Sequence, residues 1–533
     1  MNLPKGLPLA LSEAHELIRK QNSCLNEQSH QLNEQSTVIE DQADEINYLK
    51  EQLKLAKIKL FARSSERFVD PDDPQYQLFD EMPVADTEQH DSQEDDETEV
   101  SGHKRKRNRG KRTPLPSMLE RVRVEYTLPE SELIGPNGEQ YEKIGEVVSE
   151  QLEIVPAQVK VTVHVRAKYA VKGREELGVL IAPVANQPIP KSIASGSMLA
   201  HIAQSKYEYH LPLYRQERIW ASLGIDIPRN SMCRWMMKIG KMLEPLNKAM
   251  FAQMKSHGHM HVDETPVTVL ENKSTKGSHS GYMWVYANHH GVLYDYRPTR
   301  AGSGPMEMLD DYGGYVQTDR YSGYNALFES DKRISVACMA HARRKFTDIQ
   351  KAYGKSSNGI CNHVLKQMQE LYKIESHAKK NNFSADEIFQ IRQAKAIPIV
   401  DDLHQYLLDN KNTVPPKSGL GKAIAYFLNH YQALMRYTDS GIVSIDNNVA
   451  ERAIKPFAVG RKNWLFCGNT AGAIAAANIY SLIEAAKMYN LKIFDYLKYV
   501  FEKLPNTHSQ EDLIKLLPVY AQHYLPKMPV KTK

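Results

Sequence analysis

The chain has 533 residues, of which 41% are hydrophobic and 25% are charged, and its formal net charge is +4. This length predicts several domains, and so small a charge does not by itself indicate a nucleic-acid partner. Five cysteines scattered along the chain argue against a disulfide framework and suit a reducing cytosol. The start lacks the pattern of a signal peptide, and no run of 18 apolar residues predicts a membrane span. We therefore expect neither a secreted nor a membrane-spanning protein.

The segment 1–68 is expected to form a coiled coil. Ile or Leu recurs every seven residues from Ile18 to Leu60, and this period places the apolar side chains along one seam of a helix. Glutamine fills the second core position in the first half of the repeat, which weakens the seam and helps to set its register or partner number. We expect a homo-oligomer that forms through residues 18–60. A solvated single helix and an intramolecular hairpin are the alternatives.

Residues 69–118 are expected to be a disordered linker. Its first part, 70–100, is rich in Asp and Glu and poor in apolar residues. The run HKRKRNRGKR at 103–112 then places seven Lys or Arg residues within positions 104–112. This run either contacts DNA phosphates, with salt-dependent affinity, or is a solvated tail that balances the acidic block.

The next two segments change from strand-like to helical patterns. Residues 119–190 include alternating runs such as VTVHVRAKYAV and predict a small β-rich module. Within 191–250, two helical stretches at 211–224 and 229–243 are joined by a short turn, which is typical of a helix-turn-helix. An ordinary helical hairpin is the alternative. If the second helix enters the DNA major groove, the residues that face DNA are Arg229, Asn230, Ser231 and Arg234.

Three acidic residues lie in local contexts that suit one another. Asp263 follows the strand-like HMHV, Asp319 follows the strand-like YVQT, and Glu451 lies in a helical segment that begins at the N-cap candidates 446–448. Surface solvation explains most single acids. Phosphodiester chemistry, however, uses two hard divalent cations about 3.5–4 Å apart that are held by oxygen ligands. Carboxylates from two strands and one helix would converge on such a pair.

The order of these elements predicts the fold around the acids. Two further strands, at 281–288 and 291–298, separate the two aspartates, and we expect Thr265 and Pro266 to end the first strand. A strand with Asp, two strands, a strand that ends in Asp and a later helix with Glu match a ribonuclease-H-like fold. The expected fold class is thus multidomain, with α+β and α/β parts. The catalytic domain and its neighbours are placed at 251–346 (first part), 347–440 (all-helical insertion), 441–490 (second part) and 491–533 (helical tail).

Cationic side chains gather near the proposed acids. Fixed cations stabilise the charge that develops on a transferring phosphate, and they also clamp DNA backbones. Solvation of an ordinary surface is the alternative for each of them. The candidates for DNA contact are His341, Arg343, Arg344, Lys345, Lys455, Arg461 and Lys462.

At these residues the chain resembles the transposases of the bacterial insertion-sequence 66 group, from about Glu146 to about Leu517. The resemblance implies a DDE transposase that cuts DNA at element ends and joins them to a target. It places the catalytic and metal-binding triad on Asp263, Asp319 and Glu451, with two Mg²⁺ (or Mn²⁺) per active site. The implied partners are terminal-repeat DNA, target DNA and accessory proteins of the same element, in the bacterial cytoplasm near the nucleoid. The stretches that match are EVVSEQLEIVPAQVKVTVHVRAKYA, SKYEYHLPLYRQERI, HVDETPVTVL, TDRYSGYNAL, CMAHARRKF and DNNVAERAIKPFAVGRKNWLFCGN.

This chain departs from the group in its β-rich module. Relatives usually carry cysteine pairs, interpreted as a zinc-binding module, in the regions that are 129–146 and 168–178 here, and this chain has no cysteine there. We therefore expect a degenerate zinc-finger-like module without zinc. Two other functions remain open: a structure-selective nuclease of the same fold, and a non-catalytic DNA-binding regulator. The three intact acids argue against the regulator.

Overall fold

The computed structural model describes residues 7–61, 159–170, 179–181, 186–270, 277–353 and 359–528. The chain forms two compact units, one at Phe68–Val184 and one that combines Met1–Arg67 with Ala185–Lys533. Our predicted linker at 69–118, with its basic run, lies outside the described residues. Within the described ranges, no helix combines the length and apolar character that crossing a membrane requires.

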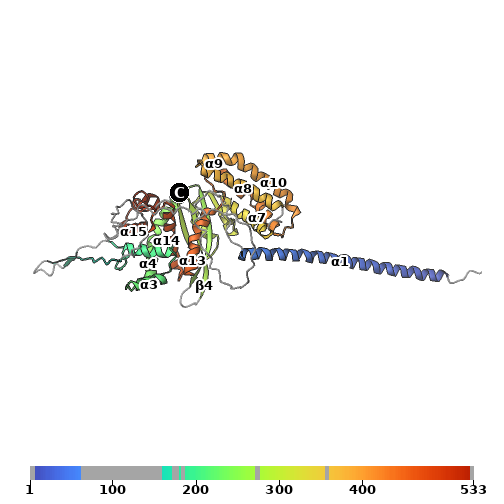
Figure 1. The fold of residues 1–533 in the computed structure, drawn as a ribbon, viewed down its shortest axis with the longest axis horizontal. Helices are drawn as coiled ribbons and strands as arrows, with labels where there is room; N and C mark the ends of the chain where they lie inside the picture. Colours follow the sequence, from blue (N-terminus) through green and yellow to red (C-terminus); the bar gives the residue numbers. More distant parts are fainter. Residues whose placement is uncertain are drawn as a thin grey trace, which may run out of the picture. The chain divides into compact units, whose positions relative to one another are not determined.

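A single continuous helix, α1 (Leu7–Phe61), fills the first described range (Figure 1). The apolar side chains of the heptad that the structure describes are all exposed, at Ile18, Leu25, Leu32, Ile39, Ile46 and Leu53. Such a row is costly to leave in water and is typical of a helix that pairs with another helix. Self-association through this seam stays a prediction.

The smaller unit is described only in part. Its strands β1 (Lys168–Ala170) and β2 (Val179–Ile181) pair antiparallel, with Lys168 opposite Ile181. Residues 159–167, which hold most of the alternating run VTVHVRAKYAV, are exposed and form no strand, so this part of our strand prediction is wrong. The alternating pattern has no neighbouring strand there to pair with among the described residues. The strands that we predicted between 119 and 158 lie outside the described residues.

Four helices open the larger unit after the smaller one: α2 (Gly196–Tyr207), α3 (Leu213–Ser222), α4 (Arg229–Met242) and α5 (Glu244–Lys255). The helices α3 and α4 occupy the two stretches in which we predicted a helix-turn-helix. Gly224 follows α3 with a φ of +76°, a left-handed conformation that glycine adopts without steric cost. On α4, Met232 and Met236 are buried, whereas Arg229 and Arg234 are exposed.

The centre of the larger unit is a five-stranded mixed sheet with the order β5-β4-β3-β6-β7. The pairs β3–β4 and β4–β5 are antiparallel, whereas β3–β6 and β6–β7 are parallel. The long central strand β3 pairs with β6 only over His259–His261, so most of its length on that side has no neighbouring strand among the described residues. The strands span His259–Leu270 (β3), Ser278–Asn288 (β4), Gly291–Arg297 (β5), Gly314–Thr318 (β6) and Arg333–Ala337 (β7).

Our prediction that Thr265 and Pro266 end the first strand is wrong, because β3 continues to Leu270. The carbonyl of Pro266 accepts a hydrogen bond from Arg461, and Thr268 and Leu270 bond in the same direction to Cys467. Pro266 therefore faces the edge away from β4. A proline on that side removes no hydrogen bond from the β3–β4 ladder, so the strand tolerates it.

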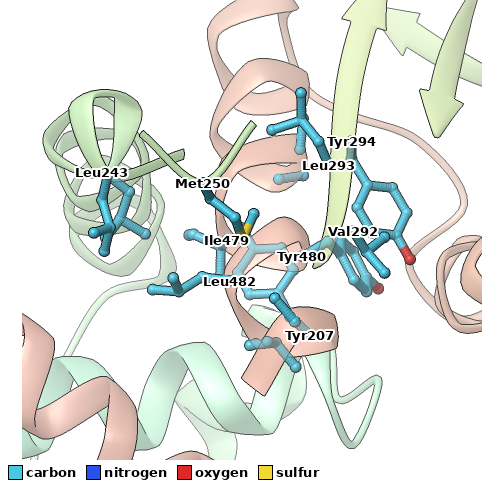
Figure 2. Close-up of a cluster of buried hydrophobic side chains, with 14 of the residues drawn as sticks. Tyr207, Leu243, Met250, Val292, Leu293, Tyr294, Ile479, Tyr480 and Leu482 are labelled. Carbon is cyan, nitrogen blue, oxygen red and sulfur yellow. The ribbon is translucent and has the colours of Figure 1, made fainter. Parts of the chain in front are cut away.

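A buried helix, α14 (Thr470–Met488), packs on this sheet and on α4. Ser481 accepts a hydrogen bond of 2.8 Å from the backbone N–H of Tyr294 on β5. Figure 2 shows Ile479, Tyr480 and Leu482 of this helix among side chains from β5 and the preceding helices. The helices around α14 include α13 (Asn448–Trp464), α15 (Ile493–Lys503), α16 (Gln510–Lys515) and α17 (Pro518–Ala521).

Helices also fill the described part of 347–440, where they surround a second hydrophobic core. Arg392, in a π-helical turn at Arg392–Ala396, is buried and donates to the carbonyls of Tyr437, Ser440 and Val443. These bonds hold the segment that leads into α13, so the helical layer is joined to the site described below. Its principal helices are α7 (Met339–Tyr353), α8 (Gly359–Lys380), α9 (Ala385–Ile391), α10 (Ile397–Asn410), α11 (Gly419–Asn429) and α12 (Tyr431–Met435).

Candidate active site

Two of the proposed acids lie on neighbouring parallel strands. The register of β3 and β6 pairs His261 with Gln317, and Asp263 and Asp319 each follow two residues later along their own chain. Neighbouring strands are about 4.8 Å apart, so the register brings the two carboxylates to one edge of the sheet. This edge lies where the parallel pairing between the two strands ends.

The turn after Asp319 is tight. Arg320 has a φ of +65°, in the left-handed region that an arginine rarely adopts. The chain reverses there, and the backbone N–H of Tyr321 donates 2.9 Å to Oδ1 of Asp319. The hydroxyl of Tyr426, from the helical insertion, donates 3.2 Å to the carbonyl of Asp319. Both the side chain and the backbone of this acid are thus held.

The third acid, Glu451, arrives on the first turn of α13. The residue before this helix, Asn447, is fully buried and reaches β3: its Nδ2 donates 3.0 Å to the carbonyl of Val262, and its Oδ1 lies 3.0 Å from Nδ1 of His261. Asn447 is the N-cap residue of α13, but its side chain makes no cap bond; the neighbouring Asp446 instead accepts at Oδ1 from the backbone N–H of Asn448. Asn447 therefore places Glu451 beside the strand of Asp263.

The pKa of Asp263 reflects both its burial and the acids near it. Burial raises the pKa of Asp263 to about 8, with the adjacent charge of Glu264 contributing next. The charges of Asp319 and Glu451 act on this pKa in the same direction. Oε1 of Glu451 is buried and makes no hydrogen bond among the described residues. Buried carboxylates without partners are costly, and a bound cation would offset this cost.

The donor set therefore fits a hard divalent cation. Mg²⁺ and Mn²⁺ prefer oxygen ligands, and carboxylates from β3, the loop after β6 and α13 supply them. The oxygen Oε1 of Glu451, which accepts no hydrogen bond among the described residues, is the specific feature that such an ion would satisfy.

A fourth carboxylate, Glu264, was missed in the sequence. Its side chain is only 2% exposed, and Arg300 lies 2.5 Å from its Oε1 while the hydroxyl of Tyr324 donates to its Oε2. The Arg300 guanidinium also lies 3.6 Å from the ring centre of Tyr321. This network ties β3 to the loop that follows Asp319. The tyrosines were visible in the motif TDRYSGYNAL, but nothing local pointed to Arg300.

Two basic side chains of α7 approach Glu451, and burial lowers the pKa of one of them, His341. Nδ1 of His341 lies 3.6 Å from Oε1, and Arg344 lies 3.7 Å from Oε2. The thiol of the buried Cys338, His341 and Glu451 form a group whose ligand atoms lie within 4.8 Å of one another. The neighbouring Lys345 lies 4.4 Å from the ring centre of Tyr426, and Arg343 is half-buried.

The other predicted DNA contacts are placed differently. Arg461 donates 3.1 Å to the hydroxyl of Thr265 as well as to Pro266, so it is engaged in holding β3. Lys455 and Lys462 on the same helix are exposed. Among the predicted residues of α4, Arg234 donates 3.2 Å to the hydroxyl of Ser231, and the backbone N–H of Arg229 donates 2.7 Å to Glu217 on α3. The structure therefore brings the α7 cations, but not the α4 residues, to the acids.

Family models of one transposase family match most of the chain. The model described as "Transposase IS66 family" covers residues 191–475, which is more than half of the 533 residues, and the "IS66 C-terminal element" covers 481–519. "Transposase C of IS166 homeodomain" matches 48–124, and the "zinc-finger binding domain of transposase IS66" matches 137–170. The resemblance found in the sequence is confirmed.

Proteins of Sinorhizobium fredii (strain NBRC 101917 / NGR234) are similar along much of their length. "Uncharacterized protein y4jD" is 32% identical over 408 residues, which cover 73% of this chain and 78% of the relative. "Uncharacterized protein y4qI" is 31% identical over 391 residues, with 70% and 71% covered. "Uncharacterized protein y4hP" is 29% identical over 435 residues, with 77% of each covered. Their names state no activity.

The zinc-finger match corrects our expectation that the protein binds no zinc. That expectation depended on the lack of cysteine in this region, whereas the match over 137–170 points to zinc binding there. The physical reason is that zinc also accepts histidine nitrogen and carboxylate oxygen as ligands. The matched stretch contains His164 and several glutamates, so a lack of cysteine does not exclude zinc.

Proposed function

Because this chain belongs to the IS66 family of transposases, we propose that it cuts DNA at the ends of an insertion sequence and joins those ends to a target. The observation that carries the proposal is the convergence of Asp263, Asp319 and Glu451, from two parallel strands and one helix. The pKa of Asp263 supports this convergence, because burial raises it and the charges of the other two acids raise it further.

The sheet supports a ribonuclease-H-like fold for the catalytic domain. In its order, β5-β4-β3-β6-β7, an antiparallel hairpin pair lies on one side of β3 and two parallel strands lie on the other. The first acid lies on the central strand, the second follows the adjacent parallel strand, and the third lies on a helix that contacts both β3 and β4. This is the arrangement that we expected from the order of elements.

Within this proposal, Asp263, Asp319 and Glu451 would hold two Mg²⁺ or Mn²⁺ ions. Such ions, when bound, activate the attacking oxygen and stabilise the leaving oxygen. The reaction has two displacements at phosphorus. Water first replaces a 3′-oxygen and frees a 3′-hydroxyl, and that hydroxyl then replaces an oxygen of the target backbone.

The protein's own cations act on the transferring phosphate. His341 and Arg344 lie beside Glu451, where Arg344 would stabilise the negative charge that develops during each displacement. Glu264 is held by Arg300 and Tyr324, and it fixes the loop of Asp319 against β3. Preorganised groups of this kind need no rearrangement at the moment of reaction.

DNA binding and assembly use other parts of the chain. The exposed face of α4, with Arg229 and Arg234, would contact the terminal repeats. The exposed apolar seam of α1 would bring two copies together, as two element ends must be held at once. Exposed cations of α13, Lys455 and Lys462, would contact the DNA backbone.

The experiment uses the purified full-length protein, duplex DNA that carries both ends of its element, a target plasmid and Mg²⁺. We expect free 3′-hydroxyls at the element ends, followed by end–target joints that sequencing can read. Cleavage without joints would make the protein a structure-selective nuclease of the same fold. Binding without cleavage, with Mg²⁺ or Mn²⁺, would make it a DNA-binding regulator.

A further inference from the structure

Three histidine rings gather at a place away from the acids. His257 lies in the turn between α5 and β3, and His289 and His290 form the turn between β4 and β5. One ring nitrogen from each lies within 4.8 Å of the others. The ring centres are 3.2 Å apart for His257 and His290, 3.9 Å for His289 and His290, and 5.3 Å for His257 and His289.

The backbone that carries these rings is fixed by hydrogen bonds from three directions. Asn288 is buried, donates 3.0 Å to a carbonyl in the last turn of α5, and accepts 3.0 Å from the N–H of His290. Tyr312 donates 3.2 Å to the carbonyl of His257, and Tyr489 donates 3.1 Å to that of His290. The two turns are thus held in register, whereas the rings themselves can rotate about their side-chain bonds.

One of the ring nitrogens lacks a partner. Nε2 of His290 is buried, and it makes no hydrogen bond among the described residues. A buried polar atom without a partner is costly, so this nitrogen requires an explanation. The two nearest aromatic neighbours are again imidazoles, and imidazole nitrogen is a preferred ligand of zinc and other late first-row metals.

We propose that His257, His289 and His290 form a three-histidine site for a divalent transition metal, with Zn²⁺ as its first candidate. Ligand nitrogens at about 2.0–2.1 Å from a tetrahedral Zn²⁺ are roughly 3.4 Å apart, and the ring nitrogens here lie within 4.8 Å of one another, so rotations of the side chains can bring them to that spacing. His257 and His290 are stacked, with 10° between their planes. Since the metal lies in the plane of each ligand ring, one of them must turn out of the stack. His289 is exposed and free to follow, and a water molecule would complete the coordination.

This site is distinct from the acids and from the zinc-finger match. His257 precedes Asp263 by six residues along the chain, which at about 3.3 Å per residue is roughly 20 Å. A metal here would join the start of the central strand to the β4–β5 turn. It would do so through the three imidazole rings, whereas the hydrogen bonds described above hold only the backbone of these turns. Its role would be to stabilise the sheet and not to take part in the chemistry.

The test counts zinc in the full-length protein. The protein is stripped with a chelator and dialysed, Zn²⁺ is titrated back, and bound zinc is measured by elemental analysis together with the midpoint of thermal unfolding. The variants are His257→Gln, His289→Gln and His290→Gln, made singly. The matched control is His404→Gln, whose ring stacks on Tyr431 in the helical insertion. Any zinc bound at 137–170 or at the acids would be present in all of these proteins, so it does not affect the difference between the variants and the wild type.

We expect each of the three variants to bind one zinc fewer per chain than the wild type, and the control to bind the full number. Zinc should also raise the midpoint of thermal unfolding less in each of the three variants than in the wild type, because one stabilising ion is lost. Equal zinc counts in variants and wild type would overturn the site. A variant can also lose zinc because it misfolds, so a second measurement uses the wild type alone. Anomalous scattering from zinc-soaked crystals should show a peak among the three rings. The absence of a peak at this place would also overturn the proposed site.

Discussion

The side-chain amide of Asn447 donates a hydrogen bond of 3.0 Å to the carbonyl oxygen of Val262, the residue before Asp263. The same side chain contacts His261, and the backbone N–H of Asn447 donates 3.2 Å to the thiol of Cys338. One buried residue thus joins β3, the start of α7 and the start of α13. These are the segments that carry the first acid, the nearby cations and the third acid.

Asn447→Ala tests this junction. The change leaves the Val262 carbonyl and the His261 nitrogen buried without partners, which should cost about 2–4 kcal/mol. For a domain of this size we expect the unfolding midpoint to fall by roughly 5–10 °C, and DNA cleavage to fall more than DNA binding, because Glu451 loses its position. Asn463→Ala removes the same amide from an exposed site on the same helix and should change neither quantity. Similar effects from both changes would contradict this role for Asn447.

Arg300→Lys tests the network around Glu264. Lysine keeps the charge but loses the planar donors that bond Glu264 and the guanidinium that stacks on Tyr321. A loss of about 1.4 kcal/mol corresponds to a tenfold lower cleavage rate, with an unchanged unfolding midpoint. Arg297→Lys is the control, since Arg297 pairs with Asp295 and Glu307 instead. If both variants cleave DNA at the same rate, Arg300 does not position the site.

Much of this architecture was predictable from local patterns. The strands before Asp263 and Asp319 and the helix of Glu451 have the apolar periods and cap residues of such elements, and the structure has them at those positions. The roles of Asn447 and Glu264 were not predictable. Asn447 looked like an N-cap, but its side chain bonds to a residue 185 positions away, and no local pattern reports such a contact.

The continuation of β3 past Pro266 escaped prediction for a related reason. A proline in a strand-like run normally indicates an end or an edge, and the sequence does not show which edges of a strand are paired. Only the short pairing with β6 and the bonds from α13 reveal that Pro266 faces the edge away from β4, where β3 has no neighbouring strand among the described residues. Likewise, the partners of Glu264, Arg300 and Tyr324, come 36 and 60 residues later in the chain.

Leu32→Asp tests assembly through α1. Leu32 lies on the exposed apolar seam, and a charge there should separate paired helices because burying an unpaired carboxylate is costly. Light scattering should show the mass falling toward the 60.7 kDa of one chain, with impaired cleavage of paired ends and intact binding of single ends. Asn26→Asp places the same charge off the seam and should leave the mass unchanged. A Leu32→Asp protein with the wild-type mass would mean that α1 serves another contact.

The central claim is that Asp263, Asp319 and Glu451 form the active site, and the most direct measurement is strand cleavage and joining by Asp263→Asn, Asp319→Asn and Glu451→Gln. Each change keeps the side-chain shape and removes one carboxylate. We predict that each lowers cleavage and joining by about a thousandfold or more, on the order of 4 kcal/mol of transition-state stabilisation, while binding to element ends persists. The exposed Glu329→Gln, close to the same loop, should behave as the wild type. Near-normal cleavage with Mg²⁺ by any one of the three variants would contradict the assignment of that acid.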